Sequence, residues 1–104
     1  MLTTVNTLAL DAPEFQSYFE GCKSIYDKAW PSNPHGGAGW DVTAGPKYLR
    51  VTHHGSVHSF VARSSGDVLK PASFKTPAKH ARGNIYDDHN GLKGMGPYGP
   101  AYLR

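Results

Sequence analysis

The side chains best suited to binding chemistry in this chain are gathered between Gly66 and Tyr86. Ammonium and guanidinium groups bind phosphate and carboxylate, and an aromatic ring beside them offers a face on which a flat ligand can stack. Around the single acid Asp67 the segment holds Lys70, Phe74, Lys75, Lys79, His80, Arg82 and Tyr86. This composition predicts an anion-binding surface and names no reaction.

Charge along the chain is uneven. Residues 1–42 carry two lysines against five acids, a net charge of −3, whereas residues 43–86 carry seven lysines and arginines against one acid, a net charge of +6. The last eighteen residues balance, so the whole chain has a net charge of +3. Asymmetry of this kind bears on partners and on electrostatic steering, not on the fold.

A short basic helix is expected to organise the charges. Thr76 and Pro77 read as a helix start and Gly83 as its stop, and Lys79 and Arg82 would then share one face. Lys75 would precede the helix N-terminus, where free N–H groups favour an anion. With Arg63 and Lys70 converging from neighbouring strand ends, the expected nucleic-acid-binding residues are Arg63, Lys70, Phe74, Lys75, Lys79, Arg82 and Tyr86.

Metal chemistry is not expected, although the chain has six histidines. Along one strand His54 and His58 would lie about 13 Å apart, too far to share an ion unless a turn at Gly55 folds them together. A single cysteine supplies no zinc-finger spacing. We therefore expect neither a metal nor another cofactor.

Catalytic motifs are also missing from the sequence. Asp87, Asp88 and His89 resemble half of a metal-nuclease cluster, but with Asn90 and Gly91 they also have the composition of an ordinary turn, and no second acidic cluster completes a site. Cys22 falls on an apolar helix face, where a thiol is inert. No phosphate-binding loop, dinucleotide fingerprint or serine elbow is present, so we expect a protein that is not an enzyme.

The elements that would position the basic surface begin with an amphipathic helix over residues 12–30. Asp11 can cap it and Pro13 suits its first turn. Its apolar positions recur at three- and four-residue spacing: Phe15, Tyr18, Phe19, Cys22, Ile25, Tyr26 and Ala29. Beyond Pro31, the glycine-rich run 32–45 is expected to be irregular, with Trp40 either packed inward or available to a partner.

Three antiparallel strands are expected at residues 47–52, 56–63 and 67–70, with Gly66 in the left-handed position of the second turn. The predicted fold class is α+β: the helix covers a small sheet of about three strands, followed by the short basic helix and an irregular C-terminal wrap. Its apolar residues are Leu92, Met95, Tyr98, Tyr102 and Leu103, which either pack on the domain or insert into a partner.

Length and composition predict one domain over residues 1–104, with residues 1–45 forming the helix and glycine-rich loop and residues 46–104 the basic sheet region and tail. The single Cys22 favours a reducing compartment. No apolar run approaches the roughly 20 residues that span a bilayer, and the first residues lack the basic flank of a secretory leader. We expect no membrane association.

The run GDVLKPASFKTPAKHARGNIY and the ending YGPAYLR resemble small uncharacterised proteins of tailed bacteriophages, over residues 56–104. The resemblance implies a phage origin and a location in the cytoplasm of an infected bacterial host, and it transfers no catalytic residue.

Two functions fit these features. The first is a nucleic-acid-binding module, in which the basic residues neutralise phosphates and rings such as Tyr48, Phe74 or Tyr86 stack on unpaired bases, which favours single strands. The alternative is an effector that binds and inhibits or redirects a host protein through the same surface. The open edges of a short sheet would also allow a homodimer.

Overall fold

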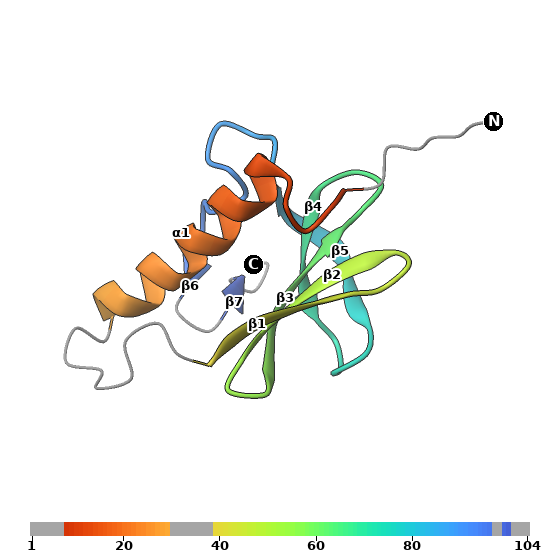
Figure 1. The fold of residues 1–104 in the computed structure, drawn as a ribbon, viewed down its shortest axis with the longest axis horizontal. Helices are drawn as coiled ribbons and strands as arrows, with labels where there is room; N and C mark the ends of the chain where they lie inside the picture. The colour runs from red at the N-terminus through yellow and green to blue at the C-terminus, as the bar shows by residue number, and fades with distance from the viewer. Residues whose placement is uncertain (1–7, 30–38, 97–98, 101–104) are drawn as a thin grey trace.

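The computed structural model describes residues 8–29, 39–96 and 99–100, and these form one helix and two antiparallel sheets. The elements are α1 (Pro13–Ala29), β1 (Trp40–Ala44), β2 (Tyr48–His53), β3 (Ser56–Ala62), β4 (Asp67–Pro71), β5 (Pro77–Asn84), β6 (Met95–Gly96) and β7 (Gly99–Pro100). Strands β1 to β5 pair in chain order, and β6 pairs with β7. The α+β class is confirmed, but the main sheet has five strands where three were predicted (Figure 1).

Helix α1 packs by one face on one side of the sheet (Figure 1). Pro13 occupies its first position as predicted, but the Ala12 carbonyl accepts the first helical bond from Gln16, so Ala12 and not Asp11 is the N-cap residue. Phe15, Tyr18 and Cys22, spaced by three and four residues, are fully buried. The predicted amphipathic helix is therefore confirmed, except for Trp30, which lies outside the described residues.

The two faces of the sheet differ in what they contact: the inner face packs against α1, and the outer face is turned away from it. The inner face of the sheet carries the buried side chains of Leu49, Val51, Ser59, Val61 and Val68. Its outer face carries Tyr48, Arg50, Phe60 and Leu69. Alternation along β2 thus separates the core residues Leu49 and Val51 from Tyr48 and Arg50 beside them.

Tight turns fix the register of the meander. The β2–β3 hairpin closes through His54 and Gly55, whose φ angles of 52° and 82° are those of a two-residue turn with both central residues left-handed. Gly66 has φ 83°, which confirms its predicted left-handed position before β4. Because the His54–Gly55 turn folds β2 back on β3, the linear spacing of the histidines does not describe their distances in space.

The prediction of an irregular segment over residues 32–45 was wrong at its end, where β1 forms. Trp40 and Val42 alternate with Asp41 and Thr43, and Val42 pairs with Val51 of β2. The Trp40 ring stacks on His53 with 4.2 Å between centroids, so it packs inward. The prediction failed because the glycine-rich run was read as one segment. Residues 40–44 alone show the apolar–polar alternation of a strand.

The prediction of a short basic helix over residues 77–82 was also wrong, because these residues form β5. The Thr76 carbonyl accepts hydrogen bonds from the backbone N–H groups of Ala72 and Ser73 and closes a hairpin with β4. So short a helix would be costly to nucleate, whereas β5 pairs the backbone of β4 and places Pro77 at a strand end. Lys79 and Arg82 consequently do not share a helical face.

The C-terminal segment packs against the domain as predicted for Leu92 and Met95, which contact the core. Leu92 approaches α1 at Gly21, where an added Cβ would lie 2.3 Å from its side chain. The segment is not wholly irregular, since it contains the short β6–β7 ladder. Tyr98, Tyr102 and Leu103 lie outside the described residues.

Candidate ligand-binding pocket

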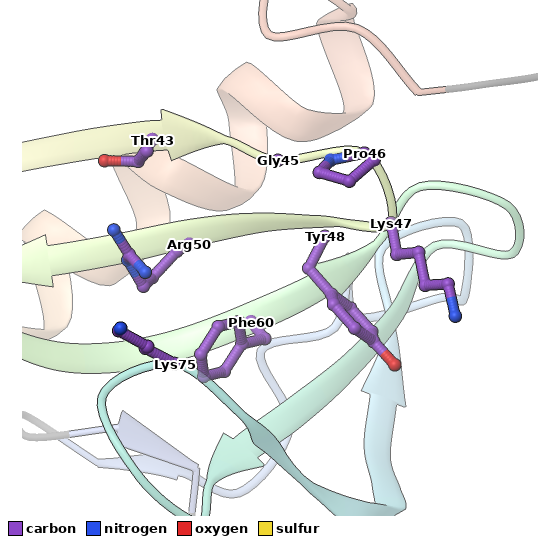
Figure 2. A pocket seen from close by; sticks show the side chains of 8 residues that line it. All are labelled: Thr43, Gly45, Pro46, Lys47, Tyr48, Arg50, Phe60 and Lys75. Atoms are coloured by element: carbon purple, nitrogen blue, oxygen red, sulfur yellow. The ribbon is translucent and has the colours of Figure 1, made fainter.

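A pocket opens on the outer face of the sheet, on the side away from α1, with a volume of about 280 Å³. Its residues come from β1, the β1–β2 turn, β2, β3 and the β4–β5 loop (Figure 2). We call it the outer pocket, and its lining residues are Thr43, Gly45, Pro46, Lys47, Tyr48, Arg50, Phe60 and Lys75. Three of them are cationic and none is acidic.

Strand register builds the floor of the outer pocket. Thr43 of β1 pairs with Arg50 of β2, and Arg50 pairs with Phe60 of β3, so the three residues form a row across the sheet. Phe60 is only 2 % exposed and meets the Tyr48 ring edge-on, at 5.8 Å between centroids and 72° between planes. The floor is therefore aromatic and rigidly placed.

Arg50 is held in place by Phe74 and has no acidic partner among the residues that the structure describes. Its guanidinium carbon lies 4.4 Å from the centroid of the Phe74 ring, and its Nη1 makes a long contact of 3.5 Å with the Phe74 carbonyl oxygen. Its Nε is buried and has no hydrogen-bond partner among the described residues. A guanidinium has five N–H donors, so Arg50 keeps most of its capacity for an anion.

One lysine lies at each end of the outer pocket. In Figure 2 the Lys75 ammonium lies near Arg50 at one end of the outer pocket, while Lys47 lies beyond Tyr48 at the other end. Both lysines are exposed. An anion between Arg50 and Lys75 would meet two positive charges and no acidic lining residue.

The sequence-predicted site residues are only partly brought together. Lys75 lines the outer pocket, and Phe74 stacks on Arg50 at its rim. Arg63 instead donates from Nε to the Leu8 carbonyl at 2.9 Å and from Nη1 to the Gly45 carbonyl at 2.6 Å, so its guanidinium is a structural tie between two segments.

The other predicted residues lie outside the lining of the outer pocket. Lys70 follows Leu69 in β4. Because successive side chains of a strand alternate, the Cα–Cβ bond of Lys70 points away from the outer face on which Leu69 lies. Lys79 is exposed on β5, and the Tyr86 ring covers Gly66. Arg82 is half-buried, with Nε and Nη1 lacking hydrogen-bond partners among the described residues.

Sequence reasoning omitted Lys47, Arg50 and Phe60 from the expected site. The signal for Arg50 was present, because alternation in the run KYLRVT puts Tyr48 and Arg50 on one face of a strand. The neighbourhood of Phe60 and Lys75 could not be read in this way, since it depends on how the β4–β5 hairpin curls over the sheet.

A second polar cluster is buried between α1 and the sheet. The Ser59 hydroxyl is 2.6 Å from the Tyr18 hydroxyl and 2.9 Å from Nδ1 of His58. Burial raises the pKa of Tyr18 and lowers the pKa of His58 to about 4, with His53 adding to the latter effect. Ser59 and Tyr18 have no exposed surface, so this arrangement secures the core and offers no substrate access.

The Asp87 segment is a turn, as its composition predicted. The Asp87 carboxylate accepts hydrogen bonds from the backbone N–H groups of Asn84, His89 and Gly91. These bonds, chiefly that from Gly91, lower the pKa of Asp87. Within residues 8–29, 39–96 and 99–100, no group of three or more histidine, cysteine or acidic side chains is placed to hold a metal ion.

The family of the chain is shown by a match over residues 16–96 to a family described as "Family of unknown function (DUF7717)". The chain belongs to this family. The match extends beyond residues 56–104, on which the resemblance noted in the sequence rests, and it includes most of α1 and the whole lining of the outer pocket. Comparison with curated proteins and with solved structures found no match. In the part of the chain that the structure describes, no helix is long and apolar enough to cross a membrane.

Proposed function

We propose that this protein binds single-stranded nucleic acid through the outer pocket. The observation that carries the proposal is a set of three cations, Lys47, Arg50 and Lys75, placed around the rings of Tyr48 and Phe60 with no acidic lining residue. Proteins that hold single strands combine positive charge along the backbone with rings on which bases stack. Duplex DNA would keep its base faces covered, so the rings favour an unpaired strand.

The proposed binding surface overlaps only partly with the surface that the sequence predicted. Lys75, Phe74 and the stacking ring Tyr48 stay in the proposed interface. Arg50 and Lys47 join it, and the structural bonds of Arg63 remove that residue. A phage origin, which the sequence resemblance implies, would place this binding in the cytoplasm of an infected bacterium.

The test is fluorescence anisotropy with labelled single-stranded and duplex DNA and RNA at about 50 and 200 mM salt. Three cations that neutralise two to three phosphates of a single strand give an expected loss of affinity between about 7- and 20-fold over this range. Lys75→Ala should weaken binding at low salt and flatten the salt dependence. Lys93→Ala is the matched control, because Lys93 is an exposed lysine that does not line the outer pocket.

Absence of single-strand binding at 50 mM salt would overturn the proposal. The effector hypothesis would then take its place, since the same cations could dock on an acidic host protein. Equal losses in Lys75→Ala and Lys93→Ala would show that the outer pocket is not the binding surface.

A further inference from the structure

We infer that the outer pocket receives one nucleotide of the bound strand, with the base against the Tyr48 ring and the phosphate between Arg50 and Lys75. This inference rests on the proposed function and narrows it, because it names the recognition unit and assigns each end of the pocket a part of that unit.

Size limits the occupant to one small unit. The volume of about 280 Å³ lies just below the range found for small-molecule sites, which is roughly 300–1,000 Å³. That space suits one planar ring with one charged group. It does not suit two stacked bases or the width of a duplex, so the rest of a strand would pass outside.

The two ends of the outer pocket differ in chemistry. Figure 2 shows the nitrogen atoms of Arg50 and Lys75 together at one end, while the Tyr48 ring extends toward the other. The Arg50 guanidinium is oriented by its stack on Phe74, and among the described residues its terminal nitrogens make only the long Nη1 contact with the Phe74 carbonyl oxygen. A phosphate at this end would supply the acceptor oxygens that the described residues do not supply.

A base fits the aromatic end. Tyr48 is half-buried and is held edge-on by the nearly fully buried Phe60, so its orientation is set before a ligand arrives. Stacking on such a ring accepts any base, because every base has a π-face. Lys47, beyond Tyr48, is placed to meet the phosphate of the neighbouring nucleotide.

The experiment titrates the full chain with adenosine 5′-monophosphate, adenosine and inorganic phosphate, followed by calorimetry and by NMR shifts of amides in residues 43–45, 47–50 and 75. We expect the monophosphate to bind at least tenfold more tightly than either fragment, since only it uses both ends. Inorganic phosphate that binds as tightly as the monophosphate would overturn the inference and leave a simple anion site.

Variants separate stacking from folding. Tyr48→Ala should lower the affinity for the monophosphate by about 5- to 150-fold, as loss of one base–ring stack does. Tyr48→Phe should preserve it, because the ring and not the hydroxyl carries the contact, and this variant also controls for folding. Equal losses in both variants would contradict stacking on Tyr48.

The same measurements distinguish this inference from the proposed function. Strand binding that the monophosphate does not compete, and that Tyr48→Ala leaves unchanged, would overturn the inference while the proposed function stood. Monophosphate binding without any strand binding would overturn the proposed function and leave the outer pocket as a site for free nucleotides.

Discussion

Individual residues in this protein show how strongly burial governs chemistry. His58 is an extra residue in β3, inserted where the β2–β3 register shifts between Val51 and Thr52, and it is only 3 % exposed. It packs edge-on against Trp40 at 5.2 Å and contacts the Ser59 hydroxyl. The same imidazole on the surface would titrate near neutral pH, whereas here desolvation keeps it neutral.

Stability should therefore depend on His58 as the solution is acidified. Its pKa is about 4 in the folded protein against 6.5 in the unfolded chain, so between these values the unfolded chain binds more protons. The contribution is fully present above pH 6.5 and is lost as the pH falls toward 4, by at most about 3 kcal/mol. Urea unfolding measured at intervals from pH 7.5 to 4 would show this loss.

The control for this expectation is His58→Phe, which keeps a ring beside Trp40 and cannot titrate. Its absolute stability is not the readout, because the contact with Ser59 is lost. We expect a smaller fall in the free energy of unfolding between pH 6.5 and 4 than in the natural protein. Parallel curves for the two proteins would show that His58 does not carry the effect.

At the scale of elements, strand pairing determined the secondary structure of two segments whose local sequence predicted something else. Residues 77–84 have the start and stop signals of a helix, yet they complete the sheet because β4 needs a partner for its backbone groups. The strand β1 likewise forms against β2 although glycines surround it. Turns, by contrast, follow from local chemistry alone.

The β2–β3 hairpin allows a clean measurement of this local chemistry. An added Cβ at Gly55 would meet no atom within 4 Å, so Gly55→Ala changes only the energy of a backbone with φ 82°. We expect a loss of stability of about 1–2 kcal/mol in urea unfolding. Gly45→Ala is the matched control, since Gly45 is not left-handed and its nearest contact would be an ordinary 3.4 Å. Equal effects at both glycines would contradict the turn assignment.

At the scale of the whole molecule, α1 and the outer pocket lie on opposite sides of one sheet. The helix seals the inner face with Phe15, Tyr18 and Cys22, which leaves the outer face free to carry cations. The helix carries Glu14, Glu20 and Asp27 together with Lys23 and Lys28, a net charge of −1, whereas the outer pocket is lined by three cations and no acid.

The reactivity of the Cys22 thiol measures whether α1 detaches from the sheet. It is fully buried, and burial raises its pKa to about 12, so neither the thiolate nor access is available in the folded protein. We expect labelling by a thiol reagent at pH 8 to be slower than in the urea-unfolded chain by a factor of a thousand or more, since stability of 5 kcal/mol or above leaves few molecules open. Rapid labelling without urea would show that α1 detaches locally.

The sequence by itself determined the helix, three of the strands, the turn at Gly66 and the Asp87 turn, because each depends on spacing or on residues a few positions apart. It also indicated a basic surface with aromatic rings. Only the tertiary structure decided that residues 77–84 are a strand, that Arg63 is tied to two carbonyls, and that Lys75 joins Tyr48, Arg50 and Phe60. These outcomes depend on strand pairing and on the curl of the β4–β5 hairpin, which bring together residues far apart in the chain and leave no local signal.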